Sequence, residues 1–477
     1  MKDAFSHFKL DDKIMKSIKE LGFKKPTPIQ SKVIPHLLLS NQDLIATAQT
    51  GTGKTAAFGL PLLQLTDTNS IKIQTLILCP TRELCLQIGK DLSTYSKYLK
   101  HINILSVYGG AKIDKQIRSL KKGPQIIVGT PGRTKDLIKR KKLFLGNIKR
   151  LVLDESDEML SMGFKDDLEF IIKSASKEKQ ILLFSATMNS KVDAVTKKYM
   201  KNSLKISVAS VNRAAENVDH IFYMVQARDR YEVVKRIADM NPKIYGIVFC
   251  RTRRETKEVA NKLMNDHYNA DTIHGDLTQN ERDDVMRRFR KRQLQILVAT
   301  DVAARGLDVE DLTHVINYNL PDDDEIYVHR SGRTGRAGRN GISIVIIHGR
   351  EHRRIKEIER KSGISFKRQN VPNGIEICKK RLYTLIDKIE KVKVNEDQIE
   401  HFLPYIYDKL NWLDREQLIK HFVSTEFNRY LSYYRDARDI NIESDSREKV
   451  RRKKPKRKRR KFFGSKNNRK NRKRKSS

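Results

Sequence analysis

Apolar and polar positions alternate in blocks along the first 210 residues. Short, continuous apolar runs are separated by longer segments in which apolar residues recur every third or fourth position, as in TAAFGLPLLQL and RELCLQIGKDLSTYSKYL. Such runs predict strands that are buried on both faces, and the segments between them predict helices. The expected strands are DLIATA, TLILCP, NILSVY, QIIVGT, RLVLDE, QILLFSA and LKISVA.

The same alternation begins again after a polar stretch, VNRAAENVDH. Here the expected strands are YGIVFC, DTIHGD, QILVATD, THVINYN and ISIVIIH. Strands that alternate with helices indicate a parallel sheet covered by helices on both faces. We therefore predict an α/β protein with two tandem doubly wound domains, 1–210 and 221–375, joined by a linker at 211–220. Ligands of such sheets bind beyond the carboxyl ends of the strands, which places a site in the cleft between the domains.

Residues 376–440 have helical periodicity and lack strand-like runs, so they predict a small helical extension. We expect four of its aromatic residues to form a core of its own, with a base-stacking platform as the alternative. These are Trp412, Phe422, Phe427 and Tyr430. Residues 441–477 contain few apolar residues and predict a disordered tail rich in Lys and Arg.

The net charge of +39 is unevenly distributed. Residues 447–477 contain 19 Lys and Arg and one acid, so this segment has a charge of +18 and the rest of the chain +21. A basic body with a more basic tail points to a polyanion, with nucleic acid as the first candidate. An anionic membrane is a weaker candidate, because the tail lacks the large apolar residues of an interfacial helix.

Other classes of protein are disfavoured by the apolar content and the cysteines. No stretch approaches the ~18 apolar residues that span a bilayer, and the N-terminal segment lacks the apolar block of a signal peptide. The four cysteines show no CxxC spacing and are too few for a disulfide scaffold. We expect reduced thiols in a soluble, intracellular protein.

The segment AQTGTGKTAAF follows an expected strand and opens an expected helix, as a phosphate-binding loop does. Its glycines allow backbone N–H groups to surround phosphate oxygens, and the helix N-terminus adds positive potential. Lys54 can reach the β- and γ-phosphates, and Thr55 can bind Mg²⁺. The predicted nucleotide-binding residues are Ala48, Gln49, Thr50, Gly51, Thr52, Gly53, Lys54 and Thr55.

The run LVLDESDEML places acids directly after an expected strand of the same domain. Asp154 can hold Mg²⁺ partly through water, because Mg²⁺ takes few carboxylates and retains waters. Glu155 can position the attacking water. Together with the phosphate loop, these acids predict a site that hydrolyses a nucleoside triphosphate.

The second domain contains HRSGRTGRAGR, in which Arg330, Arg333, Arg336 and Arg339 are three residues apart. An arginine that faces the γ-phosphate stabilises the transition state, and it would do so only when the two domains close. A nucleic-acid patch is the alternative. Near the N-terminus, GFKKPTPIQ adds a glutamine amide, Gln30, that suits an adenine edge, and Phe23, whose ring could stack on the base.

With these stretches assembled, residues 1 to about 370 resemble the DEAD-box RNA helicases of superfamily 2. The resemblance rests on ten segments in the family order: GFKKPTPIQ, AQTGTGKT, PTREL, GG, TPGR, DESD, SAT, HGDLTQNER, ATDVAARGLD and HRSGRTGR. It implies two RecA-like domains, a Q motif at 6–34, ATP and Mg²⁺ as cofactors, and selectivity for ATP through Gln30. It further implies Lys54 and Glu155 as catalytic residues, with Arg333 and Arg336 as arginine fingers.

The resemblance also implies roles for residues that spacing alone does not assign. Asp308 would contact the ribose, and Ser185 and Thr187 would couple the ATP site to the RNA site with Asp157 as their partner. RNA would bind through its phosphate–sugar backbone. The implied RNA-binding residues are Arg82, Gly110, Thr130 and Arg133 on the first domain, and Gly275, Gln279, Arg282 and Thr300 on the second.

Ser156 departs from the family pattern, which has alanine at this position, and its hydroxyl needs a partner if it is buried. We expect an active ATP-dependent RNA helicase that unwinds duplexes locally or remodels ribonucleoprotein, for example in ribosome assembly or RNA turnover. An ATP-gated RNA clamp and a DNA helicase are the alternatives. Ribosomal or degradosome-type partners and a homodimer through the extension are further candidates. The tail KKPKRKRRK predicts an RNA anchor in the cytoplasm, with nuclear import as the alternative.

Overall fold

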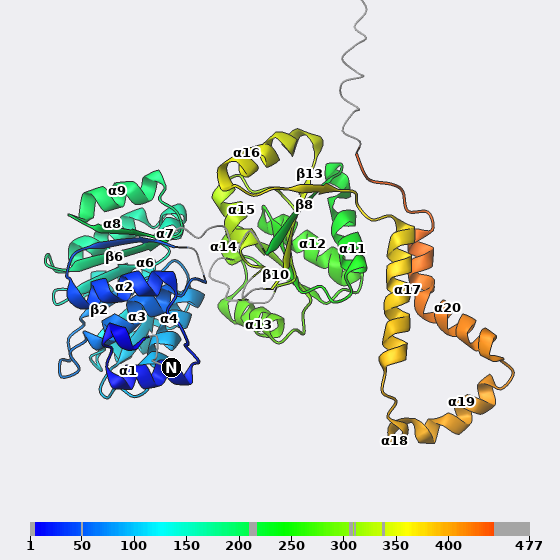
Figure 1. Ribbon diagram of the computed structural model, residues 1–477, viewed down its shortest axis with the longest axis horizontal. Helices are drawn as coiled ribbons and strands as arrows, with labels where there is room; N and C mark the ends of the chain where they lie inside the picture. Colours follow the sequence, from blue (N-terminus) through cyan, green and yellow to red (C-terminus); the bar gives the residue numbers. More distant parts are fainter. Residues whose placement is uncertain are drawn as a thin grey trace, which may run out of the picture.

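The computed structural model describes residues 5–442 except 49–50, 209–216, 305–308, 310–311 and 336–338, and it shows two α/β domains followed by a helical extension (Figure 1). The expected tail lies almost entirely outside the described residues. None of the helices in the described part is long and apolar enough to cross a membrane.

The described residues of the first domain form a sheet of seven parallel strands in the order β3-β4-β2-β5-β6-β1-β7. The strands are β1 Leu44–Thr47, β2 Thr75–Leu78, β3 Ile104–Val107, β4 Ile126–Gly129, β5 Arg150–Leu153, β6 Gln180–Ser185 and β7 Leu204–Ser207. The helices are η1 Ser6–Phe8, α1 Asp12–Glu20, α2 Pro28–Leu39, α3 Lys54–Gln64, α4 Arg82–Tyr95, α5 Ile113–Leu120, α6 Pro131–Lys139, α7 Ser156–Ser161, α8 Lys165–Ser174 and α9 Ser190–Tyr199.

Burial on both faces explains the continuous apolar runs of these strands. In β2, Leu76 and Leu78 belong to one hydrophobic core, whereas Ile77 between them belongs to the core on the other face. Successive side chains of a strand point to opposite faces, so a sheet with helices on both sides needs apolar residues at every position.

The second domain repeats this architecture, with the strand order β10-β11-β9-β12-β13-β8-β14 among the described residues. Its strands are β8 Val218–Met224, β9 Gly246–Cys250, β10 Ala270–Ile273, β11 Ile296–Thr300, β12 His314–Asn317, β13 Gly341–Ile347 and β14 Lys367–Gln369. Its helices are η2 Ala227–Asp229, α11 Arg230–Met240, α12 Arg253–Asn265, α13 Gln279–Arg290, α14 Asp301–Ala304, α15 Asp324–Ser331, η3 Gly349–Glu351 and α16 His352–Ser362. Counted from its first strand, this order is the same as in the first domain.

Two strands of the second sheet were not expected from the sequence. Strand β8 begins at Val218, so the last three residues of the expected linker belong to the sheet. Strand β8 pairs with β13 and β14. Strand β14 has three polar, exposed residues, and a run of this kind has no apolar signal.

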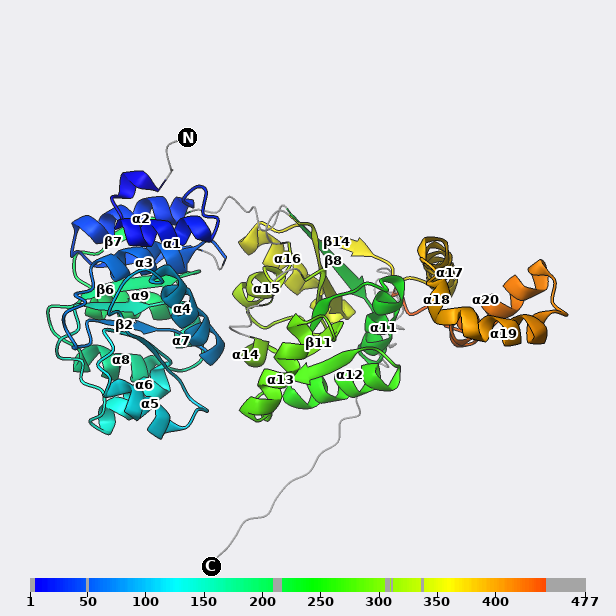
Figure 2. The same cartoon turned by 90° about the horizontal axis from the view of Figure 1, so that it is seen from below.

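The extension consists of α17 Gly374–Lys391, α18 Glu396–Ile399, η4 Glu400–Phe402, α19 Leu403–Leu410 and α20 Arg415–Tyr434. Helices α17 and α20 run side by side next to α11, and α18 and α19 lie away from the second domain (Figures 1 and 2). The prediction of an aromatic core for this module is wrong for Trp412 and Phe422, which are 69% and 44% exposed. Phe427 is buried, because it lies in the part of α20 that packs on α17.

Candidate ATP and RNA site

The phosphate loop lies between β1 and α3. Gly53 precedes α3 with a left-handed backbone, φ = +86°, which glycine adopts without steric cost. The buried Lys54 ammonium donates a hydrogen bond to the backbone oxygen of Ala48 at 3.1 Å. Gln49 and Thr50 lie outside the described residues. Lys54 is thus held at the loop, on the first turn of α3.

Gln30 contacts the phosphate loop directly. Its backbone N–H and side-chain oxygen form a capping box with Thr27 at the start of α2. The remaining amide nitrogen, Nε2, donates to the backbone oxygen of Gly53 at 3.2 Å. The ring of Phe23 packs against the first core, with its centroid 6.2 Å from that of Tyr95. The structure therefore places Gln30 at the loop and Phe23 partly inside the hydrophobic core.

Two acids follow β5 as expected. Oδ1 of the buried Asp154 accepts a hydrogen bond from the backbone N–H of Glu155 at 3.0 Å. Glu155 has φ = +50°, which is uncommon for a residue with a side chain and is typical of functional sites. Desolvation raises the pKa of Asp154 and the pKa of Glu155, while the positive charge of Lys54 opposes both shifts. The Asp154 carboxylate and the Thr55 hydroxyl offer oxygen atoms, which are the ligands that Mg²⁺ prefers.

Ser156 is buried, and its hydroxyl donates to the backbone oxygen of Phe184 in β6 at 3.2 Å. The polar atom that distinguishes this residue from alanine therefore has a partner, as its burial requires. The hydrogen bond joins α7 to the strand that leads into the SAT segment, residues 185–187.

Asp157 binds the SAT segment as the resemblance implied, but not through Ser185. Its Oδ2 accepts hydrogen bonds from Ala186 N at 3.2 Å, Thr187 N at 2.9 Å and Thr187 Oγ1 at 3.0 Å. Ser185 Oγ instead donates to the backbone oxygen of Thr187 at 2.6 Å. The serine shapes the turn, whereas the threonine contacts the acid.

Helix α15 of the second domain contacts this segment across the cleft. Thr187 Oγ1 lies 3.2 Å from Glu325 Oε2, and Nδ1 of His329 lies 2.8 Å from Glu158 Oε1. Glu325 and His329 are four residues apart, so they lie on the same face of α15. Glu158, Glu325 and His329 were not predicted to be site residues. The four-residue spacing of Glu325 and His329 is visible in the sequence and would place both on one face of a helix.

The two described arginines at the centre of HRSGRTGR differ in environment. Arg330 is buried and forms two hydrogen bonds with Asp301, at 2.6 and 2.8 Å, so it cannot belong to a surface patch. The positive charge of Arg333 counteracts the desolvation that raises the pKa of Glu155, which places this arginine near the acid of the other domain. Arg336 and Asp308 lie outside the described residues.

Three of the predicted RNA-binding residues meet at the cleft. A Cβ atom built on Gly110 would lie 3.6 Å from Arg82 Nη1 and 3.6 Å from Gln279 Oε1, so residues of both domains are close here. Arg82 also donates to Asp283 Oδ2 at 3.1 Å. Arg282 lies 3.0 Å from Glu83 Oε1.

The other predicted RNA-binding residues take part in local structure. Arg133 Nη1 donates to Gln116 Oε1 at 2.9 Å and to the backbone oxygen of Ala111, which fixes the loop after the GG pair.

Thr130 precedes α6. Thr300 Oγ1 accepts from Ala303 N at 3.4 Å, and Gly275 lies beside Arg253.

Family models match most of the chain. Residues 27–195 match the DEAD/DEAH box helicase model, 229–338 match the helicase conserved C-terminal domain, and 377–435 match the helical domain of a probable ATP-dependent RNA helicase. The chain is 45% identical over 397 residues to the ATP-dependent RNA helicase CshA of Listeria monocytogenes, covering 83% of this chain and 76% of that protein. It is 40% identical over 400 residues to the DEAD-box ATP-dependent RNA helicase CshA of Bacillus subtilis, covering 84% and 80%.

Solved structures show the same fold. Dbp5 of S. cerevisiae, bound to RNA and ADP BeF3, is 30% identical with a TM-score of 0.71 and covers 80% of this chain and 100% of that chain. Mss116p, bound to ssRNA and AMP-PNP, is 28% identical with a TM-score of 0.68 and covers 88% and 85%. Both are similar to this chain across its two α/β domains.

Proposed function

The chain belongs to the DEAD/DEAH box RNA helicases and is an ATP-hydrolysing RNA helicase, and from that premise we propose that it unwinds short RNA duplexes locally and remodels ribonucleoprotein. The observation that supports this proposal is the contact of α15 with Thr187 and Glu158. Thr187 also binds Asp157, two residues from the catalytic acid Glu155. The contact between the domains therefore involves residues that adjoin the acids proposed to act in hydrolysis.

The residues of the first domain fit an ATP-binding and hydrolysis site. Lys54 would neutralise the β- and γ-phosphates, and Glu155 would orient the attacking water. Thr55 and Asp154 would hold Mg²⁺, which neutralises charge that develops on the phosphates. Arg333 and Arg336 would supply positive charge from the second domain on closure.

RNA would bind across the cleft through its phosphates. Arg82 and Arg282 are the strongest candidates, because guanidinium groups match phosphate geometry. Backbone contacts of this kind carry little sequence information, so the enzyme would act on many RNAs. The structures of Dbp5 and Mss116p with bound RNA support this placement.

Steady-state ATP hydrolysis without nucleic acid, with single-stranded RNA and with DNA of the same sequence tests the proposal. We expect strong stimulation by RNA only, and loss of that activity in Glu155→Gln. A strand-displacement assay with a short RNA duplex then separates a helicase from an ATP-gated clamp. ATP-dependent RNA binding without displacement would favour the clamp, and equal stimulation by DNA would indicate a general nucleic-acid motor.

The setting of the enzyme is a further part of the proposal. The two CshA relatives described above are bacterial, which supports a cytoplasmic enzyme of ribosome assembly or RNA turnover, with ribosomal or degradosome-type partners, over nuclear import. The basic tail would anchor RNA through its phosphates, in a manner that weakens with salt.

The extension is a candidate surface for a homodimer. Its helices expose several large apolar side chains, and contact between two copies of the chain could bury them. They include Tyr383, Ile386, Phe402, Tyr405, Tyr407 and Trp412. Light scattering of the full chain and of Trp412→Glu would measure the mass. We expect the wild-type chain to be a dimer and the substitution to weaken dimerisation. A monomeric wild-type chain would exclude the proposed homodimer.

A further inference from the structure

A cavity of about 520 Å³ lies between the second domain and the extension, away from the ATP site. Its walls are formed by α11, the end of α12, the residues just before β9 and β11, and the facing sides of α17 and α20. It therefore opens near the amino-terminal edge of the second sheet, whereas the predicted RNA-binding residues follow the carboxyl ends of the strands. We call this cavity the extension pocket, and its volume suits a ligand of nucleotide size.

The acids of the extension pocket are already neutralised. Asp239 accepts hydrogen bonds from Tyr268 Oη at 2.6 Å, Arg381 Nη2 at 2.8 Å and Tyr434 Oη at 2.5 Å. Asp266 accepts from Tyr231 Oη at 2.6 Å and lies 3.1 Å from the Lys235 ammonium. These carboxylates therefore have little capacity left to attract a cation.

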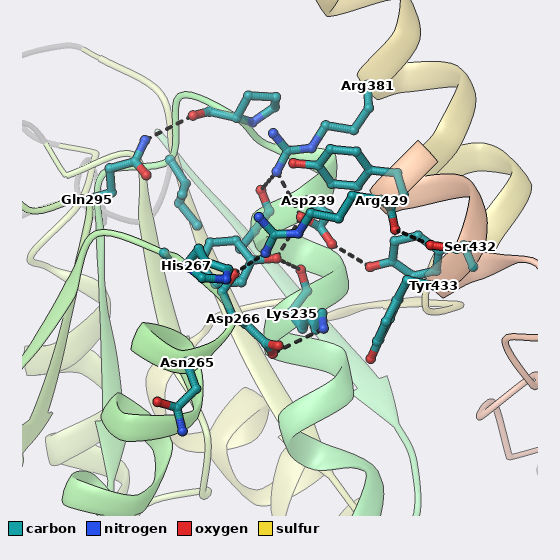
Figure 3. Close-up of a pocket in the computed structure, with 16 residues that line it drawn as sticks. Lys235, Asp239, Asn265, Asp266, His267, Gln295, Arg381, Arg429, Ser432 and Tyr433 are labelled. Atoms are coloured by element: carbon teal, nitrogen blue, oxygen red, sulfur yellow. Dashed lines mark hydrogen bonds and ion pairs between the residues drawn. The ribbon is translucent and has the colours of Figure 1, made fainter. Parts of the chain in front are cut away.

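Donors, in contrast, remain available. Nε of Arg381 is buried and has no hydrogen-bond partner. Arg429 of α20 donates through Nη2 to the backbone oxygen of Asp266 at 2.5 Å, and no acid among the described side chains forms an ion pair with it. Figure 3 shows Arg381, Arg429 and Lys235 converging on the space between the extension and α11. A buried donor without a partner is costly, so the pocket suits a ligand that brings acceptors and negative charge.

The extension pocket is also lined by tyrosine rings, two of which lie beside positively charged groups. The Arg381 guanidinium lies 4.9 Å from the ring centroid of Tyr430, and the Lys235 ammonium lies 3.5 Å from that of Tyr433. Tyr433 is 45% exposed, so part of its ring remains accessible. Stacking of bases on such rings beside cations is typical of single-strand binding.

We propose that the extension pocket binds one nucleotide of single-stranded RNA, with its phosphate at Arg381 and Arg429 and its base against Tyr433. This site would extend the path of the strand beyond the cleft, so the inference rests on the proposed action on RNA but not on the mechanism of unwinding. The Lys/Arg-rich segment 447–477 follows soon after the extension in the sequence and would raise the local concentration of RNA.

The test compares two strand lengths in the full chain. A short strand of about 8 nucleotides, within the size of one single-strand site, would fill the cleft alone, whereas a strand several times longer would reach both sites. We expect Arg429→Glu and Tyr433→Ala each to weaken binding of the longer strand about fivefold or more, the effect of one lost stacking contact. Binding of the short strand and the ATP hydrolysis that it stimulates should not change.

Arg415→Glu is the matched control, because Arg415 is an exposed arginine of the same helix outside the pocket. Equal effects of Arg415→Glu and Arg429→Glu would overturn the inference and indicate general electrostatic attraction. Photocrosslinking of a thiouridine-labelled longer strand provides a readout on wild-type protein. Crosslinks at Tyr430 or Tyr433 are expected, and crosslinks confined to the cleft would also overturn it. Failure of the short strand to stimulate ATP hydrolysis in wild type would instead reject the proposed function.

Discussion

Nη2 of Arg82 donates a hydrogen bond to Asp283 Oδ2 at 3.1 Å, although the two residues belong to different domains. Glu83, the residue after Arg82, lies 3.0 Å from Nε of Arg282, the residue before Asp283. Each domain thus supplies one arginine and one acid to the other. Because both arginines are predicted RNA-binding residues, the same groups hold the domains together and face the RNA path.

The two ion pairs should differ in importance. Arg282 and Glu83 are 17% and 14% exposed, whereas Asp283 is 53% exposed and its attraction for Arg82 is screened by water. We expect Glu83→Gln to raise the RNA concentration for half-maximal ATP hydrolysis about tenfold, since it leaves a shielded arginine unpaired. Asp283→Asn should change it by about twofold or less. A larger effect of Asp283→Asn would contradict this ranking, and ATP hydrolysis without RNA is the control.

His329 should make domain closure sensitive to pH. Burial alone lowers its pKa, but the hydrogen bond with Glu158 and the nearby Asp157 and Glu155 outweigh burial and raise it. A raised pKa means that the charged pair is fully present below the ordinary pKa of about 6.5 and is lost as the pH rises through the raised value.

We therefore expect the apparent affinity for RNA to fall as the pH rises above neutrality, and this fall to be smaller in His329→Gln. RNA-stimulated ATP hydrolysis at several RNA concentrations from acid to alkaline pH measures it. Asp154 and Glu155 titrate in both proteins, so the difference between the two profiles isolates His329. Identical profiles would show that the histidine has no part in closure.

Ser156 offers a test of the departure from the family pattern. Ser156→Ala removes a buried hydrogen bond to Phe184, which contributes about 1 kcal/mol to stability. For a domain of this size we expect the melting temperature to fall by about 2–4 °C. RNA-stimulated ATP hydrolysis should change by less than about twofold, since the hydroxyl touches none of the acids. A tenfold change in activity at unchanged stability would instead assign Ser156 to coupling.

The sequence predicted the sheets and the phosphate loop because their determinants are local. A continuous apolar run such as TLIL indicates a strand buried on both faces wherever it occurs. Strand β8 was missed because Asp219 and His220 near its start continue a polar linker and because its partner strand β13 is remote in sequence. The contacts of Glu325 and His329 were missed for the same reason, because they depend on how the domains meet.

The aromatic residues of the extension show a different limit. Trp412 and Phe427 are both large aromatic residues, yet Trp412 is exposed and Phe427 is buried. The burial of each side chain depends on which part of the extension packs on α17, and the helical pattern alone does not specify this. Ser185 likewise has the residue type of a partner for Asp157, but the turn directs its hydroxyl to Thr187.

Gly53 should be required for ATP binding for two separate reasons. Its φ of +86° disfavours any side chain, and an added Cβ would lie 2.5 Å from Nε2 of Gln30, which binds the loop. Gly53→Ala would therefore move both the loop and the glutamine. We expect ATP affinity to fall more than about tenfold, equivalent to about 1.4 kcal/mol. Titration with a fluorescent ATP analogue measures this change.

Gly22→Ala is the matched control, because Gly22 has a similar φ of +76° but nothing lies within 4 Å of an added Cβ. The backbone strain alone should cost about 1 kcal/mol of stability and leave ATP affinity unchanged. If Gly22→Ala weakens ATP binding as much as Gly53→Ala does, loss of stability rather than the contact of Gln30 with the loop explains both results. If only Gly53→Ala weakens it, the glutamine and the phosphate loop act as one binding surface.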